Sequence, residues 1–226
     1  MKVLVIGATG GSGRATVEHL LSAGHEVTAF TRRPDAAQQP RLRYTIGDAM
    51  KPADVERAVA GHDAVVVILG ISENPMRVRV LGPAHTSGDV RSRGTGNVIE
   101  AMRRHGVRKL VVQSAFGVGD SKPGLTRTNR LFYRLILAPQ IDDTERQEAL
   151  VRSSGLDWVL VRPVNLTDDA AEGMPSSADK PLVHTVSRTS VGRFNAHAVD
   201  DATLVGKAIS LSSPAPAPVP RLRETC

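Results

Sequence analysis

Three glycines at a spacing of three residues mark the first place where this chain can do chemistry. They lie in the run Gly7-Ala8-Thr9-Gly10-Gly11-Ser12-Gly13, after the apolar segment Val3–Ile6 and before a helical pattern. In such a turn one glycine permits the sharp bend, a second lets backbone amides approach a pyrophosphate, and a third lets the helix press on the sheet. The amino end of the helix offers N–H groups and a positive dipole end to the anion. The pattern predicts a dinucleotide cradle made of Gly7, Thr9, Gly10, Gly11, Ser12 and Gly13. The flanking strand and helix disfavour the alternative, a glycine-rich turn without a ligand.

The second feature is the pair Arg32-Arg33, which follows the second expected strand. NAD enzymes usually carry an acidic residue there, which holds the ribose hydroxyls. A guanidinium instead pairs with a phosphate through two parallel hydrogen bonds and stacks on adenine. The cofactor expected is therefore NADP(H), with Arg32 as the main reader of the 2′-phosphate and Arg33 or Arg14 as its helper. The alternative, in which both arginines face water, stays open.

Further candidate contacts follow the third and fourth expected strands. Asp48, followed by Ala49, is placed to accept a hydrogen bond from the adenine amino group, and a simple turn role for Asp48 is nearly as well supported. Leu69 and Gly70 should pass close to the adenosine ribose.

These residues need elements that bring them together, and the chain alternates short apolar runs with helical patterns. Strands are expected at residues 2–6, 26–31, 41–46, 63–69, 108–114, 157–162 and about 205–211, and helices at 12–23, 52–60, 94–105, 127–137, 143–153 and about 189–198. Loops are expected at 71–88 and 116–125, and an irregular stretch from 163 to about 181. This alternation predicts a single α/β domain, a doubly wound parallel sheet over residues 1–212, followed by a flexible tail at 213–226. Ligands in such sheets bind at the carboxyl ends of the strands.

Composition narrows the class of protein. The 226 residues are 41% hydrophobic and include one cysteine, Cys226, so no intramolecular disulfide forms, and a cytoplasmic location is expected. No apolar run approaches the roughly 20 residues of a membrane span. The apolar run Val3–Ile6 is also too short for the core of a signal peptide.

Charge and histidine spacing argue against a nucleic-acid site and a metal site. The formal net charge is +6, but the arginines are scattered and aromatic residues make up only 3%, which favours a solvated basic surface over nucleic-acid binding. The seven histidines show no metal-ligand spacing, so no metal is expected. The partners expected are a small-molecule substrate, with no nucleic acid and no membrane, for a monomer or homodimer.

Several segments in their order and spacing resemble the atypical short-chain dehydrogenase/reductases. They are GATGGSG, TRRP, GDAMKPADVERAVAGHDAVVVILG, NVIEAMRRHGVRKLVVQSAFGVGD and SGLDWVLVRPVNLTD. The chain is most similar to the NmrA-like NAD(P)H-binding group that includes biliverdin reductase B (flavin reductase), over about residues 1–212. The resemblance implies a Rossmann fold, NADPH, and reduction of flavins, tetrapyrroles, quinones or similar planar substrates.

The resemblance also implies roles for individual residues. It supports cofactor contacts at Gly7, Thr9, Gly10, Gly13, Arg32, Asp48, Leu69 and Gly70. It places Ser114, followed by Ala115, beside the nicotinamide, and the segment Pro163-Val164-Asn165-Leu166 over the nicotinamide ring.

One departure from the family bears on the chemistry. Typical members donate a proton from a Tyr-x-x-x-Lys pair, but the two tyrosines here, Tyr44 and Tyr133, are not followed by lysine four residues later. Where some relatives carry a lysine or histidine ahead of the sixth strand, this chain reads Asp142-Asp143-Thr144. An alcohol dehydrogenase of the usual kind is therefore not expected.

The function expected is NADPH-dependent hydride transfer to a conjugated substrate, which needs little acid help because catalysis is mainly orientation. Ser114 is the candidate catalytic residue, in a positioning role, since its hydroxyl is too weak an acid to donate a proton. The alternative for Ser114 is a serine hydrogen-bonded to neighbouring backbone. The alternative functions are an NmrA-like NADP(H) sensor without turnover, and an isomerase, cyclase or epimerase that retains its cofactor.

Overall fold

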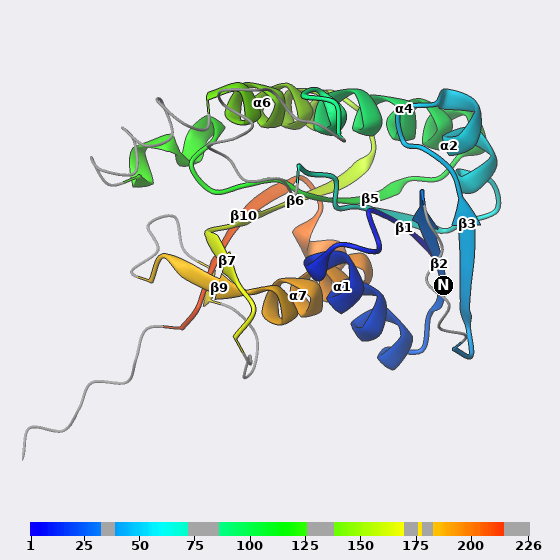
Figure 1. Cartoon of the computed structure of the whole chain (residues 1–226), viewed down its shortest axis with the longest axis horizontal. Helices are drawn as coiled ribbons and strands as arrows, with labels where there is room; N and C mark the ends of the chain where they lie inside the picture. Colours follow the sequence, from blue (N-terminus) through cyan, green and yellow to red (C-terminus); the bar gives the residue numbers. More distant parts are fainter. Residues whose placement is uncertain (33–38, 72–85, 126–137, 170–175, 178–182, 215–226) are drawn as a thin grey trace, which may run out of the picture.

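A twisted sheet between two layers of helices forms the frame of the computed structural model (Figure 1). The structure describes residues 1–32, 39–71, 86–125, 138–169, 176–177 and 183–214. The strand order is β3-β2-β1-β4-β5-β6-β10-β8, and every pairing in the sheet is parallel except that of β8 with β10. The strands are β1 (Lys2–Ile6), β2 (Glu26–Thr31), β3 (Leu42–Ile46), β4 (Ala64–Val67), β5 (Lys109–Gln113), β6 (Asp157–Pro163), β8 (Ser176–Ser177) and β10 (Lys207–Ser212). This confirms the predicted doubly wound α/β domain, with the short β8 as an unpredicted antiparallel edge.

The order reverses between β1 and β4, since the chain builds outward from β1 through β2 to β3 and then returns to add β4 on the other side. Ligands of doubly wound sheets bind at such a reversal, at the carboxyl ends of the strands. The glycine-rich turn follows β1 directly, so it lies at this point.

Helices cover both faces of the sheet. On one face lie α1 (Gly11–Ser22) and α7 (Arg188–Asp200), and on the other α2 (Pro52–Val59), α4 (Val90–His105) and α6 (Ala138–Arg152) (Figure 1). Alternate residues of β1 enter the two cores, with Val3 and Val5 on the α1 and α7 side and Leu4 and Ile6 on the other. All four are essentially inaccessible to solvent, which explains why the strand has no polar alternation.

A separate two-stranded ribbon lies beyond the end of β6. It pairs β7 (Asn165–Thr167) in parallel with β9 (Thr185–Ser187), and β9 leads directly into α7. The sequence pattern predicts an irregular stretch from 163 to about 181, and that prediction is wrong for residues 165–167. A three-residue strand whose partner lies 20 residues away has too little local pattern to be recognised.

The start of α4 is predicted at residue 94 but observed at Val90. Its first turn is held by Asp143 of α6, whose carboxylate accepts hydrogen bonds from Arg91 N at 3.0 Å and Ser92 N at 3.3 Å. This cap comes from 52 residues away, whereas the local N-cap residue, Asp89, makes no side-chain cap hydrogen bond.

Other expectations also differ from the structure. The predicted loop 116–125 contains a short 3-10 helix, η1 (Gly119–Gly124), and a second, η3 (Ala202–Leu204), precedes β10. Helix α6 begins at Ala138, five residues earlier than predicted. The predicted helix 127–137, most of the loop 71–88 and most of the tail 213–226 lie outside the described residues. In the ranges that the structure describes, no helix is both long and apolar enough to cross a bilayer.

Candidate functional site

Two glycines of the predicted cradle are required by close backbone contacts. Gly7 has a φ of 88°, in the left-handed region, and a side chain on it would overlap the carbonyl oxygen of Ile68 at the end of β4. A side chain on Gly13 would overlap the carbonyl oxygen of Gly7 and the backbone of Ala8. The turn therefore packs against the neighbouring strand and against the start of α1, as predicted for the first and third glycines.

Gly10 is different, because no contact with the part of the chain that the structure describes requires its lack of a side chain. Its φ of −71° and ψ of 162° suit any residue, and the nearest atom to an added Cβ is the Gly7 carbonyl oxygen at 3.7 Å. Gly10 is the N-cap of α1, and among the described residues no side chain caps that helix end. Thr9, Gly10 and Gly11 are exposed. The turn thus leaves an open helix amino end, the arrangement that binds a phosphate.

A buried polar network fixes the start of α1 on the sheet. Gln113, the last residue of β5, donates to Ser12 Oγ at 3.5 Å, and Asn195 of α7 donates to Gln113 Oε1 at 3.1 Å and to Thr16 Oγ1 at 3.2 Å. Thr16 Oγ1 in turn donates to the Ser12 carbonyl at 2.8 Å. Ser12 is therefore held by hydrogen bonds from Gln113 of β5 and Thr16 of α1. The sequence pattern does not indicate a role for Gln113, Asn195 or Thr16.

The residues predicted to contact the adenosine half follow β2, β3 and β4 at the same edge of the sheet. Arg32 is exposed directly after β2, whereas Arg33 lies outside the described residues. Asp48 N donates to Asp54 Oδ2 at 3.1 Å, and Asp48 Oδ1 accepts from Met50 N at 3.0 Å. The turn role that the sequence left open for Asp48 is therefore present in the structure.

Ala49, Leu69 and Gly70 lie against the amino end of α4. Ala49 is buried and its carbonyl accepts from Asn97 Nδ2 at 2.8 Å, while a Cβ added to Gly94 would overlap Leu69 Cδ1. Gly70 is exposed, and Arg91 Nη2 lies 3.0 Å from the position of a Cβ added to it. Burial lowers the pKa of Arg91, and the Asp143 carboxylate opposes that shift. A guanidinium therefore stands beside Gly70 at the edge where the cofactor is expected.

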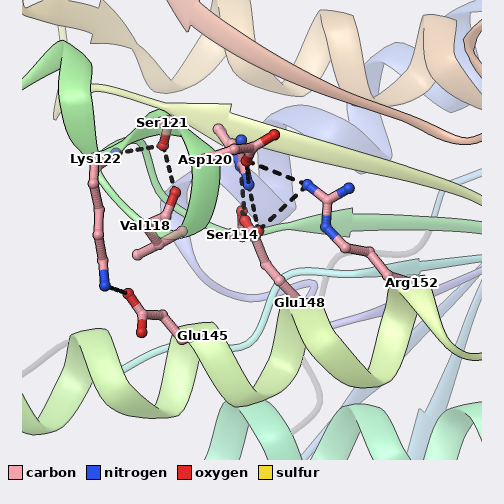
Figure 2. A network of polar contacts seen from close by, with 10 residues as sticks. Ser114, Val118, Asp120, Ser121, Lys122, Glu145, Glu148 and Arg152 are labelled. Atoms are coloured by element: carbon pink, nitrogen blue, oxygen red, sulfur yellow. Dashed lines mark hydrogen bonds and ion pairs between the residues drawn. The ribbon is translucent and has the colours of Figure 1, made fainter.

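Ser114 is buried at the end of β5, where its hydroxyl donates to Glu148 Oε1 of α6 at 2.6 Å. Glu148 is also bound by Arg162 of β6, whose Nε lies 2.8 Å from Oε1 and whose Nη2 lies 2.5 Å from Oε2. Asp120 joins the group through a 2.5 Å ion pair with Arg162 Nη2. Figure 2 shows the side chains of Ser114, Glu148, Asp120 and Arg152 pointing toward one another. Ser114 thus has a side-chain partner, not the neighbouring backbone considered from the sequence.

Two guanidinium groups face two carboxylates in this cluster, since Arg152 Nη2 also lies 3.4 Å from Asp120 Oδ1 and 3.9 Å from Glu148 Oε2. Burial alone would lower the pKa of Arg162, but its hydrogen bonds to Glu148 and Asp120 outweigh burial and raise it. Burial opposes ionisation of Asp120, yet the bond to Arg162 holds the pKa of Asp120 below its usual value. Ser114 has one hydroxyl hydrogen, and because Glu148 accepts it, only the oxygen lone pairs remain for a ligand. Ser114 can therefore accept a hydrogen bond from a ligand without disturbing the cluster, but it cannot donate one.

No tyrosine of the described residues can assist Ser114. Tyr44 lies on β3, four strands from β5 in the sheet order, which is about 19 Å at the usual strand spacing of ~4.8 Å. Tyr133 lies outside the described residues. Asp143, in the segment where relatives carry a basic residue, caps α4.

The covering segment Pro163-Val164-Asn165-Leu166 meets the segment after Ser114. Phe116 N donates to the Pro163 carbonyl at 2.9 Å. Ala115, which lies between Ser114 and Phe116 in the sequence, is half-buried. Pro163 and Val164 are buried, whereas Asn165 is exposed and Leu166 half-buried on β7. Since β1 to β6 are parallel, the predicted residues that the structure describes follow strand ends at one edge of the sheet.

Two curated proteins are similar to this chain in sequence. The chain is 29% identical over 177 residues to an uncharacterized chloroplastic protein of Arabidopsis thaliana, covering 76% of this chain and 61% of that protein. It is 32% identical over 171 residues to the 3-diazoavenalumate denitrifying reductase of a Streptomyces species, covering 72% of this chain and 55% of the reductase. The chain thus spans less than two thirds of the length of these relatives.

A solved structure shares the fold across nearly the whole chain. ChuY from Escherichia coli O157:H7, described as an anaerobilin reductase, superposes with a TM-score of 0.74 at 24% identity, covering 97% of this chain and 100% of ChuY. The model of the NAD(P)H-binding family matches residues 7–202, from the first cradle glycine to the end of α7 and beyond. This chain, whose relatives include a reductase, therefore belongs to the NAD(P)H-binding family.

Proposed function

We propose that this protein is an NADPH-dependent reductase that transfers hydride to a small planar conjugated substrate, such as a flavin, quinone, tetrapyrrole or polyketide-like carbonyl. The observation that carries the proposal is the glycine turn after β1. It ends in an α1 amino end that no described side chain caps, and no contact with the described residues requires Gly10 to lack a side chain. A bound dinucleotide pyrophosphate would require it.

The preference for NADPH rests on Arg32. It is the residue directly after β2, the position from which an acidic side chain would hold the ribose hydroxyls of NAD. A guanidinium there matches the geometry of a 2′-phosphate. Replacing Arg32 with alanine should weaken NADPH binding by about 1.5–3 kcal/mol, the range for hydrogen bonds to charged groups, and leave NADH nearly unchanged.

The class of substrate is inferred from the lack of a tyrosine proton donor beside Ser114 among the residues that the structure describes. When bound, the reduced nicotinamide supplies a hydride. The Ser114 hydrogen is committed to Glu148, and Tyr44 is too far away to serve as the acid. A conjugated acceptor tolerates this, because delocalisation stabilises its reduced form and water can supply the proton. Ser114 then acts as a positioning residue that accepts a hydrogen bond from the substrate or the nicotinamide amide.

The decisive experiment on the cradle is Gly10→Ala, measured by calorimetric titration with NADPH. The backbone at Gly10 suits alanine and the added methyl meets no atom closer than 3.7 Å, so the fold should keep its thermal stability. The methyl occupies the space in which the pyrophosphate must lie, and loss of one charge-assisted hydrogen bond corresponds to about tenfold weaker binding or more. Gly96→Ala is the matched control, since the nearest neighbour of the added Cβ is Leu150 Cδ1 of α6 at 3.8 Å. Equal NADPH affinity for both variants would refute the cradle.

Turnover is tested by the loss of NADPH absorbance with flavin, quinone and tetrapyrrole acceptors. Consumption with at least one acceptor supports the reductase. Tight NADPH binding with background rates across the panel would point instead to a sensor without turnover. A product formed without net NADPH oxidation would point to an isomerase, cyclase or epimerase.

A further inference from the structure

The ribbon of β7 and β9 carries an ion pair that the proposed site does not use. Asp168 directly follows β7, and Arg188 directly follows β9 as the first residue of α7. Because the two strands are parallel, both residues leave the ribbon at the same end. There Arg188 Nη1 lies 2.7 Å from Asp168 Oδ1.

The Arg188 side chain lies over the phosphate cradle. Its Cδ occupies the place of a Cβ on Gly11, and its Nε and Cγ lie 3.1 and 3.8 Å from that point. Gly11 is therefore the residue that makes room for the arginine, a role separate from the approach of a phosphate at Gly10.

The close contact between α1 and α7 brings Arg188 over Gly11. One turn further along both helices, Gly192 packs so tightly on Ala15 that a Cβ on Gly192 would overlap the Ala15 backbone. Both helices run against the direction of the strands, so both begin at the carboxyl edge of the sheet, with their amino ends side by side.

The electrostatics of this corner favour an anion. Neither helix has an acidic residue in its first turn, and each contributes a positive dipole end. The α7 end is capped by Ser187, whose Oγ accepts from Ser190 N at 3.0 Å, whereas the α1 end has no side-chain cap in the described structure. The balancing carboxylate, Asp168, is 87% exposed, while Arg188 is 32% exposed. An exposed partner of this kind holds a guanidinium only weakly.

We propose that Arg188 is a clamp for the pyrophosphate of the bound dinucleotide, and that Asp168 holds it over Gly11 until the cofactor arrives. The inference rests on the proposed function and adds a residue to it. On binding, the guanidinium exchanges one carboxylate oxygen for pyrophosphate oxygens, which match its paired N–H groups. The clamp acts on the part common to NAD and NADP, so it contributes affinity without selecting between them.

The test is nucleotide titration of Arg188→Ala beside the wild-type protein. NADPH, NADH and ADP-ribose, which all contain the pyrophosphate, should each bind about tenfold more weakly or worse. Adenosine 2′-monophosphate, which lacks the pyrophosphate, should bind as it does to the wild type. Arg32→Ala should show the opposite pattern, with NADPH weakened and NADH unchanged.

Three further variants separate a direct contact of Arg188 with the pyrophosphate from a general effect of positive charge on α7. Arg193→Ala removes a positive charge from the same helix and should leave all affinities unchanged. Arg188→Lys keeps the charge without the paired donors and should bind with intermediate affinity. Asp168→Asn removes the competing carboxylate and should bind NADH as tightly as the wild type or up to about fivefold tighter.

The clamp is overturned if Arg188→Ala binds NADH within twofold of the wild type, or if it loses affinity for NADPH alone. Should Arg188→Ala fail to fold, two other variants decide. Severalfold weaker NADH binding by Asp168→Asn would overturn the proposal that Arg188 leaves Asp168 when the cofactor binds. Wild-type NADH affinity in Arg188→Lys would overturn the contact of paired guanidinium N–H groups with the pyrophosphate. Failure of the proposed function is a separate outcome, in which the wild-type protein itself binds no nicotinamide nucleotide.

Discussion

Removal of the Glu148 carboxylate is the perturbation with the largest expected effect on stability. Glu148 accepts hydrogen bonds from Ser114 Oγ and from both Arg162 Nε and Nη2, and Glu148 and Arg162 are 5% and 3% exposed. In Glu148→Ala, Arg162 keeps only Asp120, its partner at Nη2, while its Nε and the Ser114 hydroxyl lose their acceptor. Removing one partner of a buried pair costs about 3–5 kcal/mol, and here the buried Arg162 would keep as its counter-charge only Asp120, which is 70% exposed. Since domains are stable by about 5–15 kcal/mol, this variant should be marginal.

The assay is urea denaturation followed by circular dichroism, with two comparison variants. Arg108→Ala removes an ion pair to Asp157 of similar length, 2.8 Å, but its side chains are 63% and 40% exposed, so the cost should be about 0–1 kcal/mol. The double variant Glu148→Leu with Arg162→Met replaces the buried pair by apolar groups and should be more stable than Glu148→Ala alone.

The reasoning is refuted if Glu148→Ala and Arg108→Ala cost the same, since burial would then not determine the worth of the pair. It is also refuted if the double variant is less stable than the single one. In that case the charge left behind on Arg162 would not be the source of the loss.

Three further predictions concern other contacts. Gly13→Ala should lower stability by about 1–3 kcal/mol by thermal unfolding, because the added methyl overlaps the Gly7 carbonyl; an unchanged melting temperature would contradict the close contact. Burial opposes ionisation of Asp120, but the bond to Arg162 lowers its pKa from the usual 3.8, so its stabilisation is complete above about pH 5 and is lost as pH falls through the lowered value. Asp120→Asn should therefore flatten the acid limb of the stability–pH curve, and an identical limb would exclude that contribution. Asp143→Ala removes the α4 cap and should lower the free energy of unfolding, measured by urea denaturation, by about 0.5–2 kcal/mol, with loss of helical signal confined to the first turn. An unchanged free energy of unfolding would mean that the cap is not needed.

Local sequence patterns by themselves determine much of this fold. The strands at residues 2–6 and 26–31 are predicted to the residue, because buried parallel strands are short apolar runs bounded by turn residues. The parallel order follows from their alternation with helices, and this order places the ends of β1 to β6 at one edge. The glycine turn and Ser114 can therefore be assigned to the same edge from the sequence alone.

Tertiary structure decided which side chains face each other there. Arg162, which follows the apolar run Trp158–Val161 in β6, indicates in the sequence that a buried partner is needed, but not that Glu148 is that partner. The start of α4 depends on Asp143, 52 residues away, and Asn195 reaches Thr16 across 179 residues. Arg188 comes to lie over Gly11 only because two helices far apart in the chain begin side by side. Propensities and periodicities act over a few residues, whereas these contacts exist only once packing has brought distant segments together. For that reason the sequence predicts the edge of the sheet at which the candidate residues lie, but only the tertiary structure determines which side chains contact each other there.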